Sequence, residues 1–304
     1  MYELIIVGAG PAGITASIYA ARKRMNFLVI AKDIGGQAAL SSDIENYTGY
    51  QYITGPELTK KFEQHMHEFQ IELKYEDVVG IEKTDEGFKV KTAKGIHESM
   101  ALIIASGAKP RRLNVPGEQE FKNRGVTYCA TCDAPLFPDK DVVVIGSGNS
   151  GFDATLQLMK IANKIYLIER GPRLAGDEVM MREKVERSDK VTVLTNTKVL
   201  EISGDKFVTG VTVEREGKQE MLGVQGVFIE IGYIPNSEFA AEVVKLNERK
   251  EIVVDDRCRT SVDGIFAAGD VTDVPQKQII VAAGEGAKAA LCAHEYLQKL
   301  RKRP

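Results

Sequence analysis

The chain has 304 residues, 43% of them hydrophobic and 27% charged, with 28 glycines and no tryptophan, a composition that excludes disordered and collagen-like proteins. A net charge of −3 provides no basic field for holding nucleic acid or an anionic membrane, so we expect small molecules and proteins as partners. Apolar stretches are shorter than the ~20 residues that a membrane span needs, and the first residues lack a secretory signal, so the sequence predicts a cytoplasmic protein with no membrane-spanning segment.

The chain begins with the pattern strand, glycine turn, helix, strand. Apolar residues 4–7 lead into Gly8-Ala9-Gly10-Pro11-Ala12-Gly13, followed by a helical pattern through residue 24 and an apolar run at 27–30. In such a turn the first glycine permits the bend, the second lets the backbone approach a pyrophosphate, and the third lets the helix pack on the strand. A dinucleotide site is therefore predicted at Gly8, Gly10, Pro11, Ala12 and Gly13, with the phosphates at the helix N-terminus.

Two cysteines, Cys129 and Cys132, are separated by two residues and followed by Asp133. Haem attachment is disfavoured because Asp133 stands where that motif needs a histidine, and zinc is disfavoured because no second ligand pair has similar spacing. Two sulfurs at this spacing suit thiol-disulfide exchange, in which one thiolate attacks a partner and the other resolves the mixed disulfide. Asp133 is a candidate proton shuttle, and a local turn or helix-cap role for it stays open.

The pattern of the first segment returns 138 residues later (146 − 8 = 138). Residues 142–145 lead into Gly146-Ser147-Gly148-Asn149-Ser150-Gly151, then a helical pattern to about residue 162 and an apolar run at 165–168. A second dinucleotide site is therefore predicted at Gly146, Gly148, Asn149 and Ser150. Where an acid often binds the ribose, the first copy has Ala31 and the second Glu169, so we expect two different dinucleotides, a flavin and a nicotinamide.

Near the end of the chain, residues 264–270 read as a buried strand that ends in Gly269 and Asp270. A carboxylate at this point can meet the polyol of a flavin, and an ordinary turn remains the alternative. Residues 278–297 have a mostly helical pattern, and the N-terminus of that helix could direct its positive dipole end at an anionic flavin ring.

These segments predict an α/β protein with two Rossmann-like dinucleotide-binding domains, the second inserted into the first. The expected boundaries are 1–114 with 247–304 for a discontinuous FAD-binding domain. Residues 115–246 form the expected nicotinamide-nucleotide domain, which also carries the cysteine pair.

In this order and spacing, the motifs resemble those of low-molecular-weight thioredoxin reductases, and closely those of the flavoprotein reductase portion of bacterial alkyl hydroperoxide reductase. The resemblance extends over essentially the whole chain and rests on the two glycine turns, Gly35-Gly36-Gln37, Glu45-Asn46-Tyr47, Cys129-Ala130-Thr131-Cys132-Asp133, and Ala268-Gly269-Asp270-Val271 followed by Gln278. It implies a redox-active Cys129–Cys132 disulfide, Asp133 as proton donor, FAD on the first domain, domain rotation and a homodimer. Ala31 agrees with the family, in which other residues hold FAD; those implied here are Gly35, Gly36, Gln37, Asn46, Gly107, Gly269, Asp270, Lys277, Gln278 and Ile279.

Two departures from the family pattern concern the electron donor and the acceptor. NADPH-dependent thioredoxin reductases usually place a His-Arg-Arg cluster where this chain has Glu169-Arg170-Gly171-Pro172-Arg173. A carboxylate at Glu169 repels a 2′-phosphate and can bond a free ribose diol, which favours NADH, while Arg170 and Arg173 keep NADPH open. The hydroperoxide-type reductase carries an N-terminal thioredoxin-like extension, whereas the first strand is expected here at residue 3 or 4, so we expect a separate acceptor protein.

The sequence thus predicts a FAD-dependent thioredoxin-disulfide reductase. Electrons would pass from NADH or NADPH through FAD and the Cys129–Cys132 disulfide to a thioredoxin-like or glutaredoxin-like protein. One alternative is a donor other than a nicotinamide, such as ferredoxin, and another is a hydroperoxide-system reductase acting on a separate glutaredoxin-like acceptor. Two rival interpretations are a flavin-dependent reductase with an idle cysteine pair and a noncatalytic metal-binding or scaffold protein on the same fold.

Overall fold

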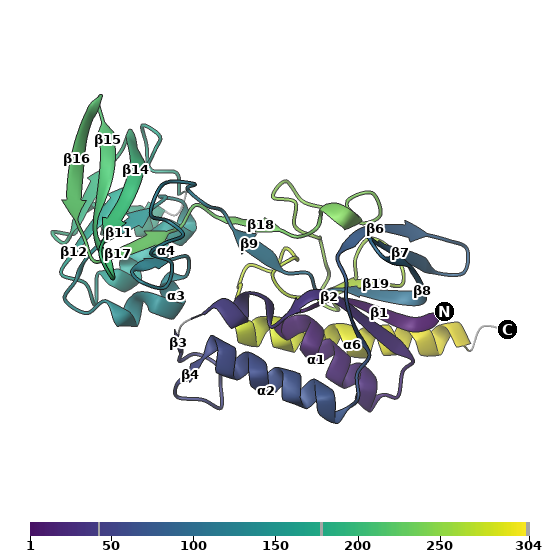
Figure 1. Cartoon of the computed structure of the whole chain (residues 1–304). Coiled ribbons are helices and arrows are strands. Elements are labelled where there is room, and N and C mark those ends of the chain that lie inside the picture. The colour runs from purple at the N-terminus through teal and green to yellow at the C-terminus, as the bar shows by residue number, and fades with distance from the viewer. Residues whose placement is uncertain (42, 177–178, 302–304) are drawn as a thin grey trace. The chain divides into compact units, whose positions relative to one another are not determined.

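The computed structural model describes residues 1–41, 43–176 and 179–301, which divide between two compact units (Figure 1). Unit 1 consists of Met1–Lys109 and Ile234–Pro304, and unit 2 is the continuous segment Pro110–Tyr233. The last three residues of the expected FAD-binding domain, 302–304, lie outside the described residues.

The chain passes between the units twice, and the two passing segments pair with each other. Strand β9 (Ala108–Pro110) and strand β18 (Tyr233–Pro235) form a two-stranded sheet. The units therefore divide within these strands, whereas the sequence placed the boundaries after residues 114 and 246. The difference arises because backbone pairing between distant segments fixes the division, and the local signal for the first boundary was only the Pro116-Gly117 turn.

Unit 1 is built on a mostly parallel sheet with the order β5-β2-β1-β8-β7-β6, and β19 pairs with β8. Alternate residues of the central strand face opposite layers: Leu4 and Ile6 pack with helices α1 (Pro11–Arg22) and α6 (Ile279–Arg301), while Ile5 packs with residues 240–252. Both faces are covered, which is why the strand is apolar and buried from Leu4 to Val7. The strands are β1 (Tyr2–Ala9), β2 (Phe27–Ile34), β5 (Leu73–Tyr75), β6 (Val78–Lys83), β7 (Phe88–Thr92), β8 (Gly95–Ile104) and β19 (Ile265–Ala267).

Two helices of unit 1 show how their local sequence fits the fold. Helix α2 starts with a capping box, in which the Thr54 hydroxyl accepts from the Glu57 N–H and the Glu57 carboxylate accepts from the Thr54 N–H. Helix α6 approaches α1 closely at Gly286, where an added Cβ would lie 2.0 Å from the Ala12 carbonyl oxygen. The helices and short elements are α1 (Pro11–Arg22), α2 (Gly55–Glu68), α6 (Ile279–Arg301), η1 (Gly36–Leu40), η3 (Glu238–Ala240), β3 (Asp43–Ile44) and β4 (Ile53–Thr54).

Unit 2 combines a parallel sheet, in the order β10-β17-β11-β12-β13, with an antiparallel sheet, β14-β15-β16. One cluster of buried residues joins the two sheets, with Val143 and Val227 from the first packed with Val211 and Val213 from the second. The elements are β10 (Val126–Thr127), α3 (Ala130–Asp133), η2 (Ala134–Leu136), β11 (Asp141–Ile145), α4 (Asn149–Leu158), β12 (Lys164–Ile168), α5 (Val179–Glu186), β13 (Val191–Leu194), β14 (Thr197–Gly204), β15 (Val208–Arg215), β16 (Lys218–Gly223) and β17 (Gly226–Ile229).

The repeat seen in the sequence is a repeat of strand register as well. In unit 1 the first two strands pair in parallel with Leu4 opposite Phe27, and in unit 2 with Val142 opposite Ile165. Both members of the pair are 138 residues apart between the copies (142 − 4 and 165 − 27). The α/β class with two Rossmann-like units is thereby confirmed. Within the described ranges, no helix is long and apolar enough to cross a membrane.

Candidate functional site

The glycine turn of unit 1 has a tight base and an open mouth. Gly8 has φ +107°, and a Cβ there would lie 2.3 Å from the Ala105 carbonyl oxygen. A Cβ on Gly13 would lie 1.9 Å from the carbonyl oxygen of Gly8, so helix and strand touch at this point. At Gly10, in contrast, an added Cβ meets nothing within 4 Å. Pro11 and Ala12 begin helix α1, so this open space lies at a helix N-terminus, where a phosphate is favoured.

A second turn of unit 1 closes onto this mouth. Gly36, with φ +53°, lies so near that its added Cβ would be 3.4 Å from the Gly10 Cα. Gly35, with φ +91°, packs on Thr59, whose buried hydroxyl oxygen has no hydrogen-bond partner among the described residues. Gln37 follows in the 3-10 turn η1. The sequence predicted Gly35, Gly36 and Gln37 as one contact segment, and the structure brings at least its glycines to the first turn.

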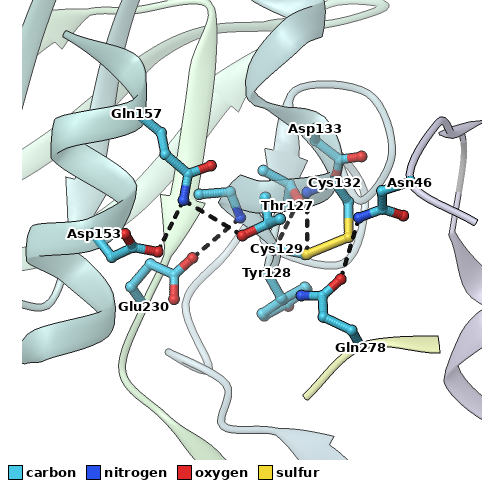
Figure 2. Close-up of a disulfide and its surroundings, with 12 residues drawn as sticks. Asn46, Thr127, Tyr128, Cys129, Cys132, Asp133, Asp153, Gln157, Glu230 and Gln278 are labelled. Carbon is cyan, nitrogen blue, oxygen red and sulfur yellow. Dashed lines mark hydrogen bonds between the residues drawn. A yellow bond between two sulfur atoms is a disulfide. The ribbon is translucent and has the colours of Figure 1, made fainter. Parts of the chain in front are cut away.

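Residues from the two ends of the chain also meet in unit 1. The Asn46 side-chain amide donates to the Gln278 side-chain oxygen at 3.2 Å, across 232 positions of sequence (Figure 2). Gln278 directly precedes helix α6, which begins at Ile279. Gly107, with φ +67°, has open space where a Cβ would stand.

The strand end at Gly269 and Asp270 adjoins the same turn. Gly269 has φ +78°, and its added Cβ would lie 3.0 Å from the Ala12 Cβ. Its N–H donates to the Glu285 carboxylate of helix α6 at 2.7 Å. Burial raises the pKa of the Asp270 carboxyl, while the charge of Lys277 opposes the rise. The Lys277 ammonium also donates to the Asp270 backbone oxygen at 3.3 Å, which fixes the segment before the helix.

The unit 1 residues therefore fit a flavin dinucleotide. The open positions at Gly10 and Gly107 leave backbone accessible where a side chain would block it. The unpartnered Thr59 hydroxyl and the buried Asp270 carboxyl supply polar groups at the same turns. Three segments that lie far apart in the sequence, at Gly10, Gly36 and Gly269, are brought into contact at this turn.

Unit 2 carries a disulfide between Cys129 and Cys132, with their Cα atoms 5.3 Å apart (Figure 2). Cys129 precedes the short helix α3, and its sulfur accepts the Cys132 N–H at 3.3 Å. The Thr127 hydroxyl donates to the Asp133 carboxylate and accepts the Cys129 N–H, the latter at 3.2 Å. Thr127 thus holds Asp133 and the first cysteine in one arrangement.

The segment before the disulfide is anchored by a buried acid that the sequence analysis did not single out. Glu118 is 1% exposed, and its carboxylate accepts the N–H groups of Leu113 at 3.0 Å and Asn114 at 2.7 Å. It also accepts the Tyr128 hydroxyl at 2.8 Å. Burial and this carboxylate raise the pKa of Tyr128, so the phenol stays protonated as a donor.

The glycine turn of unit 2 repeats the geometry of the first. Gly146 has φ +104°, and its added Cβ would lie 2.4 Å from the Glu230 carbonyl oxygen. A Cβ on Gly151 would lie 1.9 Å from the Gly146 carbonyl oxygen, while Gly148 has nothing within 4 Å. Asn149 and Ser150 begin helix α4 and are exposed at its N-terminus. The turn can therefore hold a second dinucleotide pyrophosphate.

Glu169 follows strand β12 and is bonded to the same turn. Its carboxylate accepts the Ser147 hydroxyl and N–H, the N–H at 3.3 Å, and the Gly171 N–H at 2.7 Å. Burial opposes its ionisation, but hydrogen bonds from Ser147, Gly171 and Arg170 outweigh burial and lower the pKa of the carboxyl. Glu169 is thus held as a carboxylate, and the side chains of Arg170 and Arg173 are exposed beside it.

The remaining cysteines lie in unit 1 as free thiols, Cys258 buried and Cys292 half-buried. Burial raises the pKa of the Cys258 thiol to about 12, so it is an inert core residue near neutral pH. Across the part of the chain that the structure describes, no group of three or more His, Cys, Asp or Glu side chains is arranged to hold a metal ion.

Comparison with known proteins assigns the chain to a family. Residues 2–286 match the family model described as pyridine nucleotide-disulphide oxidoreductase. The chain belongs to this family. Membership implies an oxidoreductase with FAD and a nicotinamide donor. The family resemblance that the sequence motifs indicated is thereby confirmed.

Individual relatives agree with this assignment. Bacillus subtilis NADH dehydrogenase is 43% identical over 300 residues, 97% of this chain and 58% of that protein. One component of the alkyl hydroperoxide reductase of Staphylococcus aureus is 42% identical over 300 residues, 97% of this chain and 59% of that protein. The chain thus spans less than two thirds of these curated relatives. The crystal structure of Streptococcus pyogenes thioredoxin reductase is 37% identical, with a TM-score of 0.92, and the match covers 98% of this chain and 99% of that chain.

Two further acids escaped the sequence analysis, Glu230 at the end of β17 and Glu285 in α6. Both are buried, at 9% and 8% exposure, and both bond backbone N–H groups at the predicted motifs. Glu285 lies in the run Gly284-Glu285-Gly286, where a charged residue between glycines on a helix was an available signal. Glu230 follows an apolar strand and differs in no local feature from a strand-end acid.

Proposed function

We propose that the chain is a FAD-dependent disulfide reductase, which passes electrons from a nicotinamide nucleotide to the Cys129–Cys132 disulfide and then to a thioredoxin-like or glutaredoxin-like protein. The observation that carries the proposal is a disulfide held in the same unit as a dinucleotide-type glycine turn. The net reaction is NAD(P)H + H⁺ + partner disulfide → NAD(P)⁺ + partner dithiol. FAD, when bound, supplies the two-electron chemistry that links a hydride donor to a disulfide.

Unit 1 would hold FAD in this scheme. The N–H groups at Gly10 and the start of helix α1 would bind its pyrophosphate, because that helix end is open and carries a partial positive charge. Asp270, at the end of a buried strand, would accept hydrogen bonds from hydroxyl groups of the flavin polyol. The other proposed contacts are Gly8, Pro11, Ala12, Gly13, Gly35, Gly36, Gln37, Asn46, Gly107, Gly269, Lys277, Gln278 and Ile279.

The cysteine pair would reduce the partner by exchange. After the Cys129–Cys132 disulfide is reduced, one of its thiolates attacks the partner disulfide and forms a mixed disulfide, and the other thiolate displaces the partner's second sulfur. Asp133, oriented by the Thr127 hydroxyl, would give or take the thiol proton. Either cysteine can be the attacking one in this scheme.

The donor we propose is NADH. Glu169 is held as a carboxylate beside the second glycine turn. There it would accept hydrogen bonds from the two hydroxyl groups of a ribose and repel a 2′-phosphate. The name of the Bacillus subtilis relative, NADH dehydrogenase, supports the same choice. NADPH, drawn by Arg170 and Arg173, is the alternative nucleotide, and a protein donor such as ferredoxin is the other alternative.

The proposal extends to the setting of the enzyme. The acceptor we propose is a thioredoxin-like or glutaredoxin-like disulfide, which is supported by the similarity of the chain to a thioredoxin reductase. A reducing cytoplasm suits a cysteine pair that must cycle through the dithiol. Homodimerisation is part of the proposal through the family resemblance, and sedimentation of the holoenzyme tests it.

The experiment that tests this function is an anaerobic titration of the holoenzyme with NADH and, separately, NADPH. Flavin absorbance and the number of free thiols are followed together. We expect NADH to bleach the flavin and to produce two new thiols, and the Cys132→Ser variant to bleach without gaining them. Bleaching by dithionite but by neither nucleotide would refute the nicotinamide donor and favour a protein donor.

A further inference from the structure

Glu230 occupies a position whose counterpart in unit 1 is an alanine. The Glu230 N–H donates to the Ile145 carbonyl at 2.8 Å, as the Ala105 N–H donates to the Val7 carbonyl at 2.7 Å. The carbonyl oxygens of Glu230 and Ala105 face the first glycine of the turn in each unit. The repeated fold therefore does not need a carboxyl group here.

The Glu230 side chain joins the two motifs of unit 2. Its Oε1 accepts the Ala130 N–H at 3.3 Å, directly after Cys129 (Figure 2). It also accepts a hydrogen bond from the hydroxyl of Ser150, at the exposed start of helix α4. One carboxyl group thus contacts both the disulfide turn and the nucleotide turn.

A second link runs beside the first. The Gln157 amide donates to the Asp153 carboxylate at 2.8 Å and to the Thr131 hydroxyl at 3.4 Å, so it also connects α4 with the disulfide segment (Figure 2). Burial, helped by the charge of Asp153 and opposed by the hydrogen bonds from Ala130 and Ser150, raises the pKa of Glu230 to about 7. Near neutral pH, Glu230 is therefore close to half ionised.

We propose that Glu230 is a positioning residue that couples occupancy of the nucleotide turn of unit 2 to the redox equilibrium of the Cys129–Cys132 pair. This rests on the proposed function, in which that turn binds the nicotinamide nucleotide. A pyrophosphate at the start of α4 places negative charge next to the Glu230 carboxylate and competes for the Ser150 hydroxyl. Both effects favour the neutral acid, so the ionised fraction of Glu230 takes up protons from solvent as the nucleotide binds.

The neutral acid changes the surroundings of the cysteines. A carboxylate bonded to the Ala130 N–H opposes negative charge on the neighbouring thiols, and protonation removes this opposition. Nucleotide binding then favours the dithiol form, in which thiolates can arise. By linkage, reduction of the disulfide must tighten nucleotide binding by the same factor.

The test measures proton uptake when NAD⁺ binds to the oxidised holoenzyme at pH 7, by calorimetry in buffers of different ionisation enthalpy. NADP⁺ is titrated in parallel, and NAD⁺ is used because it does not reduce the flavin. A half-ionised group can take up at most about 0.5 proton, and we expect roughly 0.3 to 0.5 in the wild type. Glu230→Gln, which keeps the shape and loses the titration, should take up less than about 0.1, and so should Glu230→Ala, which copies the unit 1 residue.

A redox readout accompanies the calorimetry. Saturating NAD⁺ should shift the equilibrium of the cysteine pair with a reference dithiol by about threefold to tenfold toward the reduced form, which corresponds to roughly 15 to 30 mV for two electrons. The shift should vanish in Glu230→Gln. Glu220→Gln, at an exposed position of β16 in the same unit, is the matched control and should behave as wild type in both measurements.

The outcomes separate this inference from the proposed function. If NADH reduces the flavin and the thiols as expected but proton uptake is equal in wild type and Glu230→Gln, the coupling is refuted and the function stands. If neither nucleotide binds, both fail together. An unchanged redox shift in Glu230→Gln would also refute the coupling.

Discussion

Alanine at the second or the third glycine of the unit 1 turn should produce two different defects. At Gly13 an added Cβ would lie 1.9 Å from the Gly8 carbonyl oxygen, so helix α1 must move away from strand β1 by more than 1 Å. At Gly10 the added Cβ meets nothing within 4 Å, and φ −78° with ψ −175° is extended backbone that alanine adopts freely. Gly13→Ala should therefore disturb the fold, and Gly10→Ala should disturb the bound dinucleotide.

The magnitudes follow from these distances. Forcing an atom into a packed contact costs typically 1–3 kcal/mol and sometimes more, so we expect about 3 kcal/mol for Gly13→Ala. In a chain of this size that lowers the Tm of the apoprotein by roughly 6 °C. Gly10→Ala loses only a helix N-cap preference of about 1 kcal/mol, or roughly 2 °C. Its methyl group displaces a phosphate from charged hydrogen bonds worth about 1.5–3 kcal/mol each, which weakens FAD binding about 10- to 100-fold.

The assay compares the thermal unfolding of the apoproteins by circular dichroism with FAD affinity by fluorescence quenching. Gly148→Ala and Gly151→Ala are the internal controls, because the geometry is the same in unit 2 and the affinity for FAD should stay at the wild-type value. Equal losses of apoprotein Tm in Gly10→Ala and Gly13→Ala would refute the steric reasoning. Wild-type FAD affinity in Gly10→Ala would refute the assignment of that space to the pyrophosphate.

Further predictions concern the cysteines, the donor, pH and stability. Cys132→Ser should lower turnover with a thioredoxin-like acceptor at least about 1000-fold, whereas an unchanged rate would identify the pair as idle. Glu169→Ala should raise the KM for NADH about tenfold, the loss of about 1.4 kcal/mol, and a KM equal to wild type in steady-state kinetics would remove Glu169 from the site. Burial raises the pKa of Glu230 from 4.5 to about 7. The free energy of unfolding should therefore fall by up to about 3 kcal/mol as pH rises from 4.5 to 7. In Glu230→Gln, urea unfolding should show no such fall over the same pH range. Glu118→Leu removes the acceptor of three part-buried hydrogen bonds and should cost about 3 kcal/mol or more, read from the urea midpoint. A cost below about 1 kcal/mol would contradict the anchoring role.

The parts of the fold that could be predicted from sequence are those in which one local pattern has one physical solution. A glycine is required at Gly8 and Gly13 because backbone carbonyls occupy the side-chain positions, and this need is the same wherever the turn occurs. Buried parallel strands read as continuous apolar runs, as residues 4–7 of β1 and 142–145 of β11 do. The cysteine pair is likewise a short-range signal, because both sulfurs lie within one turn.

The parts that could not be predicted depend on contacts between distant residues. Ala130 and Glu230 are 100 positions apart, and Asn46 and Gln278 are 232 apart. Nothing next to Glu230 in the sequence distinguishes it from an acid at the surface end of a strand. The antiparallel strands β14, β15 and β16 are half exposed and carry charges, so their apolar pattern is weaker than that of the central parallel strands.

Because β9 pairs with β18, the two chain segments that connect unit 2 to unit 1 lie side by side. On the unit 1 side, the Asn236 N–H donates to the Gly107 carbonyl at 2.9 Å, and on the unit 2 side the Arg111 N–H donates to the Gly232 carbonyl at 2.9 Å. If the chain were cut within these two strands, the two ends left on unit 1 would be adjacent, and so would the two ends left on unit 2. A few glycines could join residue 107 to residue 236, or close residues 111–232 into a ring, without stretching either core. Unit 2 is thus connected to unit 1 in the way that a loop is connected to the two strands it joins.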